Sequence, residues 1–245
     1  MTFGPYEIIQ IDERSWRIES GFVRALLFAG AERALLVDTA NVSGPLDEAV
    51  RSLTDKPVTL VNTHADPDHI GANDRFAEVW MHPAEFGYYA QQRSPGFAAP
   101  RPVWDGVTLD LGGRSFEVIL VPGHTPGSIA LYERETGVLV GGDSISSTPV
   151  FLFGGMRSPE AFEASLARLS ERAADIRCIY PSHGVFPLGA EQIEKELACI
   201  RRLLRGELSP QEPPYPLPAK MYLWDGAGVY FIPEELSRLR GHLNG

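Results

Sequence analysis

The feature that most constrains this chain is a run of potential metal ligands directly after an apolar segment. Residues 58–62, Val-Thr-Leu-Val-Asn, have the composition of a short buried strand. The next segment, Thr-His-Ala-Asp-Pro-Asp-His-Ile-Gly at 63–71, places four histidine and aspartate side chains within six positions. Gly71 to Asn73 are suited to begin a helix, so we expect the ligands on a loop between a strand and a helix. Any one of these side chains is most simply a helix cap, but four together favour a metal site.

Three further turns repeat this design at distant points of the chain. His124 lies in Pro-Gly-His-Thr-Pro-Gly-Ser, Asp143 in Gly-Gly-Asp-Ser and His183 in Pro-Ser-His-Gly. Each turn follows or separates apolar segments with strand composition, and its glycines allow the backbone to approach a shared centre closely. Taken singly, either histidine is better explained as a hydrogen-bonded structural residue. Four of the six histidines lie in these turns and in the 63–71 segment, which favours one shared site.

The apolar segments predict a mixed α/β fold. Strands are expected at 7–11, 15–18, 23–28, 34–38, 58–62, 107–111, 115–121, 129–132, 137–140 and 176–180. Helices are expected after Ser43, around Phe76 and Val79 before a strand that ends at His82, over 83–91, from Ser158, and over 193–204, with a loop at 92–102. Strands are followed by a helix in each half of the chain. We therefore predict a four-layer αββα sandwich of two mixed β-sheets with helices on both outer faces.

The C-terminal part is expected to belong to the same domain. Residues 1–208 are predicted to form the main domain, and residues 209–245 a Pro-rich extension with a hairpin around Gly226 to Gly228. A short helix is expected over 233–242. The aromatic residues of this segment would cover the site or form the contact of a homodimer.

Composition and charge narrow the classes of function. The chain has 245 residues, 44% of them hydrophobic, which is enough for a sizeable core. Its formal net charge of -10 argues against binding to nucleic acid. The N-terminus lacks the pattern of a signal peptide, and no apolar run approaches about 20 residues, so we expect a cytoplasmic protein without membrane association. Cys178 and Cys199 are expected to be reduced core residues.

These turns resemble the metallo-β-lactamase fold superfamily, whose signature is His-x-His-x-Asp-His followed by a histidine, a bridging aspartate and a final histidine. The order and spacing match from about residue 20 to about residue 190. The resemblance implies a two-metal site. Its implied ligands are His64, Asp66 and His124 for the first ion, Asp68, His69 and His183 for the second, and Asp143 as the bridge.

The segment Leu-Val-Asp-Thr-Ala at 36–40 is similar to the acidic turn that precedes the first helix in this family. The similarity implies that Asp38 fixes a ligand loop through hydrogen bonds. Helix capping by the same side chain is an equal alternative.

One position departs from the signature, because Asp66 stands where most members have the second histidine. Imidazole nitrogen and carboxylate oxygen suit zinc, iron and manganese, whereas calcium prefers oxygen alone. The additional carboxylate makes the centre less electrophilic and favours iron or manganese over zinc. The expected cofactors are therefore two divalent metal ions, either zinc or, given Asp66, iron or manganese.

The resemblance implies a metallo-hydrolase that acts on a small molecule. A hydroxide activated by both ions would attack an ester-like bond of a lactone, thioester or phosphoester, with Asp68 as the general acid and base. The substrate itself stays open because this fold hosts many chemistries. Tyr88, Phe153 and Arg157 are candidates for substrate contact, although core packing or solvation explains them equally well.

Two other functions remain open. An acidic residue at position 66 also resembles the di-iron branch of the superfamily, which reduces or binds oxygen, although no flavin domain follows the core here. The second alternative is a metal-binding module without catalysis. Thioesterases of the glyoxalase II type carry an additional helical C-terminal domain with basic residues that bind glutathione. We do not expect that activity, because the segment after His183 is too short for such a domain.

Overall fold

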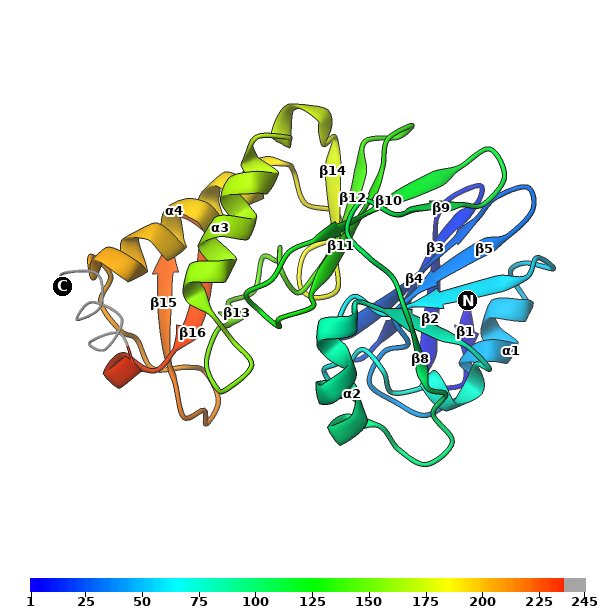
Figure 1. The fold of residues 1–245 in the computed structure, drawn as a ribbon, viewed down its shortest axis with the longest axis horizontal. Coiled ribbons are helices and arrows are strands. Elements are labelled where there is room, and N and C mark those ends of the chain that lie inside the picture. Colours follow the sequence, from blue (N-terminus) through cyan, green and yellow to red (C-terminus); the bar gives the residue numbers. More distant parts are fainter. Residues whose placement is uncertain (236–245) are drawn as a thin grey trace. The chain divides into compact units, whose positions relative to one another are not determined.

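The computed structural model describes residues 1–235, which form two compact units (Figure 1). The first unit contains residues 1–120 and 129–136, and the second contains residues 121–128 and the chain from residue 137 onward. The predicted division between residues 208 and 209 stays a prediction.

An eight-stranded mixed sheet dominates the first unit. Neighbours up to β5 are antiparallel, whereas β5 to β8 run parallel to one another. Every residue of β4 is buried, as expected of a strand that is covered on both faces. The strands are β1 (Thr2–Phe3), β2 (Tyr6–Asp12), β3 (Ser15–Ser20), β4 (Val23–Ala29), β5 (Ala34–Val37), β6 (Val58–Val61), β7 (Val79–Met81) and β8 (Pro100–Pro102).

The two faces of this sheet pack against different elements of the same unit. On one face, Leu46 of α1 (Leu46–Arg51) and Tyr89 of α2 (Phe86–Gln92) join a core that contains Leu27 of β4. On the other face, the rings of Phe28 and Phe116 lie 4.8 Å apart, centroid to centroid. Phe116 belongs to β10, the middle strand of an antiparallel group. This group consists of β9 (Thr108–Asp110), β10 (Ser115–Leu120) and β11 (Ile129–Glu133).

The second unit combines two long helices with two groups of strands. Its parallel pair is β12 (Val138–Gly142) and β14 (Cys178–Pro181), and a separate sheet has the order β13 (Val150–Phe151), β16 (Ala227–Phe231), β15 (Lys220–Trp224). The helices α3 (Pro159–Ser170) and α4 (Glu191–Arg205) lie side by side, and α4 also contacts β15 and β16 (Figure 1). Short 3₁₀ helices occur in both units, at Asn73–Arg75, Pro83–Glu85 and Ala173–Asp175.

Most of the predicted strands and helices are confirmed, and two segments differ. The helix expected around Phe76 and Val79 is wrong: a 3₁₀ turn ends at Arg75, and Val79 begins β7, which pairs with β6 at Trp80. The β-branched Val79 and the aromatic Trp80 favour this parallel strand over a helix. The loop expected over 92–102 contains β8, which has proline at both ends as an edge strand tolerates.

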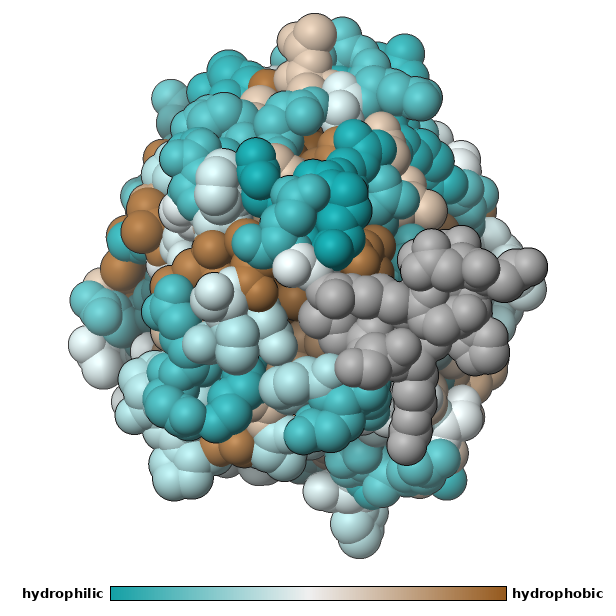
Figure 2. Space-filling model, turned by 90° about the vertical axis from the view of Figure 1, so that its left-hand side faces the viewer, coloured by the Kyte–Doolittle hydropathy of each residue, from teal (hydrophilic) through white to brown (hydrophobic). Residues whose placement is uncertain are grey.

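The C-terminal hairpin of β15 and β16 is confirmed. In this hairpin, Tyr222 and Tyr230 are buried and Trp224 is exposed. Tyr215, which precedes β15, is also exposed. Figure 2 shows the side of the molecule on which α4 and β15 lie, where hydrophilic residues predominate and apolar residues form separate patches. The homodimer contact stays a prediction. The helix predicted over 233–242 falls outside the described residues after position 235.

Two further expectations concern the helices and the cysteines. Within the described part of the chain, no helix is long and apolar enough to span a membrane.

Cys199 is a buried free thiol whose pKa is raised to about 12, first by burial and then by nearby Glu196. Cys178 is free and half-buried, and burial also raises its pKa. Raised thiol pKa values keep both side chains protonated and unreactive near neutral pH.

Candidate metal centre

The ligand-rich segment 63–69 leaves the sheet at the carboxyl ends of two neighbouring parallel strands. β5 and β6 are paired so that Val37 lies opposite Val61, and the chain continues from these residues to Asp38 and Asn62. Functional side chains of parallel sheets gather at this edge because successive strands deliver their loops there. The predicted strand before the loop is confirmed, but the element that follows the loop is only the short 3₁₀ helix Asn73–Arg75 and not an α-helix.

Asp38 holds both ends of this segment through its carboxylate. Its Oδ1 accepts a hydrogen bond from the Thr63 backbone N–H at 2.7 Å, and its Oδ2 accepts one from the Thr63 hydroxyl at 2.8 Å. The same Oδ2 lies 2.8 Å from Nδ1 of His69, and Asp38 is 1% exposed. A carboxylate that accepts from Nδ1 selects one imidazole tautomer and sets the direction of Nε2. These contacts connect Asp38 to both Thr63 and His69, whereas its predicted role in supporting metal ligands stays a prediction.

The backbone at this turn adopts an unusual conformation. Asp38 and Ala40 have φ values of 61° and 57°, which non-glycine residues seldom adopt. Hydrogen bonds hold the turn against the loop, from the Thr39 N–H to the His69 carbonyl at 2.9 Å and from the Gly71 N–H to the Ala40 carbonyl at 2.8 Å. A Cβ atom at Gly71 would lie 2.6 Å from the Ala40 oxygen, so only glycine allows this approach.

Two histidines and two aspartates of the first unit form a compact group. The rings of His64 and His69 are tilted, with centroids 4.0 Å apart, and both residues are buried. His64 Nε2 lies 3.5 Å from Asp66 Oδ2, and His69 Nε2 lies 3.8 Å from Asp68 Oδ2. His64 Nδ1 lies 3.0 Å from the hydroxyl of Thr63. The Nε2 atoms therefore face carboxylate oxygens while the Nδ1 atoms face the supporting structure.

Helix α2 and the 3₁₀ turn before it contact the centre of the loop. The Tyr88 hydroxyl donates a hydrogen bond of 2.8 Å to Asp66 Oδ1. Glu85 is completely buried, and its Oε2 accepts a hydrogen bond of 2.9 Å from the backbone N–H of Ala65. Sequence reasoning missed Glu85, and it named Tyr88 only as a candidate for substrate contact. The available signal was the spacing of Glu85 and Tyr88, which are three residues apart in the segment predicted as a helix over 83–91. This spacing places two side chains on the same face of a helix.

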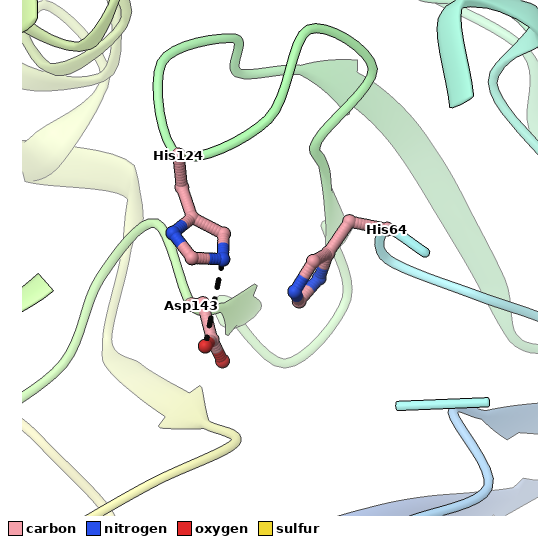
Figure 3. A group of neighbouring side chains, drawn as sticks. All are labelled: His64, His124 and Asp143. Carbon is pink, nitrogen blue, oxygen red and sulfur yellow. Dashed lines mark ion pairs between the residues drawn. The ribbon is translucent and has the colours of Figure 1, made fainter. Parts of the chain in front are cut away.

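In the second unit, Asp143 and His183 follow the carboxyl ends of another pair of parallel strands. β12 and β14 are paired so that Gly142 lies opposite Pro181. His183 Nε2 lies 3.2 Å from Asp143 Oδ1, and His124 Nε2 lies 3.7 Å from Asp143 Oδ2, as the dashed line in Figure 3 marks. One carboxylate thus faces two histidines with its two oxygen atoms, which is the arrangement that a bridging ligand requires.

The turn that carries His124 is held by α3. Its Gly123 has a φ of 143°, and a Cβ atom there would lie 2.4 Å from the Cα of Phe162. The N–H of Ser158, the N-cap of α3, donates to the Gly123 carbonyl at 2.9 Å. His124 is 1% exposed, and its Nδ1 lies 2.9 Å from the carbonyl oxygen of Phe151. Close packing therefore determines the position and the ring orientation of this histidine.

The loop after Asp143 is attached to α4 by two buried side chains. Glu196 Oε1 accepts a hydrogen bond from the Ser146 N–H at 2.7 Å, and the Gln192 side chain donates to the Ser146 carbonyl at 2.7 Å. Glu196 is fully buried, and this desolvation raises its pKa from 4.5 to about 8. Among the described residues, its second oxygen has no hydrogen-bond partner. A neutral carboxyl at this point fits the apolar surroundings of the helix.

The donor atoms in each unit fit a divalent transition metal. Two ligand atoms at about 2.1 Å from one ion lie roughly 3.0–3.4 Å apart in octahedral or tetrahedral geometry. Of the four distances between histidine Nε2 and aspartate oxygen, 3.2 Å lies in this range, and 3.5, 3.7 and 3.8 Å lie above it, so the donors would have to move slightly closer around an ion. The mixture of imidazole nitrogen and carboxylate oxygen suits zinc, iron or manganese.

The remaining candidate residues have contacts of their own. Phe153 is half-buried, with its ring centroid 5.6 Å from that of Phe151. The backbone N–H of Arg157 donates to the Gly154 carbonyl at 3.1 Å, which closes a turn before α3. Contact of Phe153, Arg157 or Tyr88 with a substrate stays a prediction.

Comparisons with known proteins agree with this geometry. The chain is 34% identical over 140 residues to a hydroxyacylglutathione hydrolase of Synechococcus sp. (strain JA-2-3B'a(2-13)), which covers 56% of this chain and 54% of that protein. It is 28% identical over 157 residues to the acyl-coenzyme A thioesterase MBLAC2 of Gallus gallus, covering 49% of this chain and 56% of that protein. The chain spans about half the length of the curated relatives it matches.

A solved structure and a family model identify the fold and the family. A metallo-beta-lactamase from Pontibacter korlensis superposes with a TM-score of 0.69 at 20% identity, covering 80% of this chain and 99% of that chain. This likeness confirms the predicted mixed α/β class and the metallo-β-lactamase fold. The sequence model of the metallo-beta-lactamase superfamily matches residues 19–183, which contain every predicted metal ligand. The chain therefore belongs to the metallo-β-lactamase superfamily.

Proposed function

We propose that this protein is a metal-dependent hydrolase that cleaves an ester-like bond of a small molecule. The observation that carries the proposal is the repeated pairing of a histidine Nε2 with an aspartate oxygen at 3.2–3.8 Å, twice in each unit. Metal ligands of this type serve as hydrolytic centres when the ions retain an open position. Membership of a superfamily that contains hydrolases supports the same conclusion.

In this proposal, the ligands of both units bind two divalent ions. His64, Asp66 and His124 would hold the first ion, Asp68, His69 and His183 the second, and Asp143 would bridge them. The two-oxygen contact of Asp143 with His124 and His183 supports the bridging assignment. The contact of His69 with Asp38 supports an ordered Nε2 ligand at the second ion.

The chemistry would divide between the ions and the side chains. Bound divalent ions supply a nucleophile near neutral pH and stabilise charge on the attacked oxygen. Asp68 would hold the attacking water and transfer its proton to the leaving group. Its side chain is 26% exposed, compared with 13% for Asp66 and for Asp143, so it is the one best placed to exchange a proton with solvent.

The substrate class that the comparisons favour is a thioester. The names of the two curated relatives reported above describe thioester hydrolysis. Lactones and phosphoesters remain alternatives because the same centre activates their attack equally well.

The test combines metal analysis with a substrate panel. Protein expressed without metal bias is analysed for zinc, iron and manganese, and is then assayed with lactone, thioester, phosphodiester and β-lactam substrates. We expect close to two ions per chain and hydrolysis of at least one class. Asp68→Ala should also weaken the second ion, so it is assayed at saturating metal, where kcat should still fall by about 10²–10⁴-fold if this carboxylate moves the proton. His64→Ala should lower both metal content and activity.

The outcomes separate the hydrolase from the two alternatives. A protein that binds metal but hydrolyses no member of the panel, and that bleaches with dithionite and recolours in air, would be the di-iron redox protein. The carboxylate at position 66 is the observation that favours this second candidate. Metal content without hydrolysis or redox change would indicate a binding module, and absence of bound metal would reject all three.

A further inference from the structure

Three of the four histidines proposed as metal ligands share one mode of support. In each of three rings, Nδ1 is held by the surrounding structure, and Nε2 faces an aspartate oxygen. The three Nδ1 contacts are His64 to the Thr63 hydroxyl at 3.0 Å, His69 to Asp38 at 2.8 Å, and His124 to the Phe151 carbonyl at 2.9 Å. Such a contact orients the ring and leaves a single direction for the ligand atom.

An aspartate in place of a histidine has a different problem. Its two oxygens are chemically equal, and the carboxylate rotates about one bond, so it can bind an ion through one oxygen or both. A ligand that must replace an imidazole nitrogen is better ordered when one of its oxygens is already engaged. Asp66 is the aspartate to which this applies, because the family signature has histidine at its position.

The hydroxyl of Tyr88 engages one oxygen of Asp66. It donates to Oδ1 at 2.8 Å, while Oδ2 of the same carboxylate lies 3.5 Å from His64 Nε2. We propose that Tyr88 is a positioning residue that makes Asp66 a one-oxygen metal ligand, as the Nδ1 contacts do for the histidines. This inference rests on the proposed two-metal site.

Residues before and after Tyr88 have contacts that hold α2 and the 3₁₀ helix Pro83–Glu85 in place. Glu85, three residues earlier, accepts a hydrogen bond from the Ala65 N–H at 2.9 Å and is completely buried. Tyr89, the next residue, is 1% exposed and stacks on Phe97 with ring centroids 6.0 Å apart. Two adjoining helical elements therefore contact Ala65 and Asp66, and the phenol needs little additional ordering to hold the carboxylate.

The experiment measures metal affinity and does not depend on activity. Metal-free wild type and Tyr88→Phe are titrated with Mn²⁺ and with Zn²⁺ in competition with a chromophoric chelator, which resolves the two ions. We expect Tyr88→Phe to weaken one of the two ions by about 10-fold or more and to leave the other within about twofold. The Mn²⁺ electron paramagnetic resonance spectrum of the weakened site should change as well.

Tyr89→Phe is the matched control on the same helix. Its hydroxyl donates to the Ala98 carbonyl at 3.2 Å and has no contact with Asp66 among the hydrogen bonds of the described residues. It should leave both affinities within about twofold of wild type. Equal losses in Tyr88→Phe and Tyr89→Phe would mean that the effect arises from α2 packing, which would overturn the proposal.

A second background tests whether Tyr88 acts through Asp66. In Asp66→Ala, there is no carboxylate for Tyr88 to orient, so adding Tyr88→Phe should change neither affinity by more than about twofold. A loss as large as that in the wild-type background would overturn the proposal. Unchanged affinities in Tyr88→Phe would overturn this inference alone, whereas a wild-type protein that binds neither ion would reject the metal site as a whole.

Discussion

Asp38 Oδ2 lies 2.8 Å from His69 Nδ1, and the carboxylate that makes this contact also accepts two hydrogen bonds from Thr63. Thr63 begins the ligand segment and His69 ends it, so one side chain determines the separation of the two ends. Asp38 does this from a backbone with φ of 61°, a conformation that costs free energy unless the surroundings impose it. The turn is therefore stabilised by the loop that it organises.

Replacement of Asp38 should separate metal affinity from stability. Asp38→Asn keeps a residue that tolerates positive φ and an oxygen for the Thr63 N–H, but the NH₂ group that replaces Oδ2 cannot accept from the His69 ring. We expect affinity for one ion to fall by about 10–100-fold, with little change in the free energy of unfolding of the metal-free protein. Chelator competition and urea denaturation measure the two quantities.

Asp38→Ala should affect both quantities. It leaves the Thr63 donors and the His69 ring without their acceptor in a buried place and retains the unfavourable φ. We expect the metal-free protein to lose about 2–3 kcal/mol of stability. If Asp38→Asn and Asp38→Ala reduce stability equally, the contacts of Oδ2 with the Thr63 hydroxyl and the His69 ring, which both variants lose, would be the main contribution.

Gly71→Ala should destabilise the first unit because the new Cβ would lie 2.6 Å from backbone atoms of Ala40 and Val42. Backbone on both sides of the contact has little freedom to move, so we expect a loss of about 1–3 kcal/mol in urea denaturation. Gly87→Ala is the control, since a Cβ there meets nothing within 4 Å and alanine favours the helix. If Gly71→Ala and Gly87→Ala were equally stable, the backbone around Gly71 would be able to move enough to accept a Cβ atom.

Asp66→His should change the preferred metal. Exchange of a carboxylate for an imidazole removes an anionic oxygen ligand and restores the nitrogen ligand of the family signature. We expect the ratio of Zn²⁺ to Mn²⁺ affinity to rise by about 10-fold or more, as measured by competition titration. Wild-type protein that already contains only zinc at full occupancy would contradict the preference for iron or manganese on which this prediction depends.

Glu196 should make the stability of the second unit depend on pH. Burial raises its pKa from 4.5 to about 8, so between these values the folded protein retains a proton that the unfolded chain has released. Stability is therefore highest below pH 4.5 and falls as the pH rises towards 8, by roughly 1 kcal/mol per pH unit from this group. Glu196→Gln cannot ionise and should lose this dependence.

Urea denaturation at pH 5, 6, 7 and 8 measures this effect. The stability of Glu196→Gln relative to wild type should rise steadily over the series. Glu191→Gln removes an exposed carboxyl from the same helix and is the control. Parallel curves for Glu196→Gln and wild type would show that Glu196 is ionised in the folded protein.

The local elements and the ligand types were predictable from the sequence. Short apolar segments bounded by glycine and proline identify strands, and His, Asp and Gly directly after them identify loops at strand ends. The short helix predicted around Phe76 and Val79 was the exception, whereas the strand expected to end at His82 is confirmed as β7. Pro100 and Pro102 concealed β8, since proline normally argues against a strand.

By itself, the sequence determined which residue types stand at the strand ends and the family to which the chain belongs. Only the tertiary structure decided how those residues are supported: Asp38 meets His69 over 31 positions, Tyr88 meets Asp66 over 22, and Glu196 meets Ser146 over 50. Hydrophobic periodicity reports the burial of a residue relative to its neighbours in the chain. Contacts between distant residues depend instead on strand register and helix packing, which the whole core sets at once.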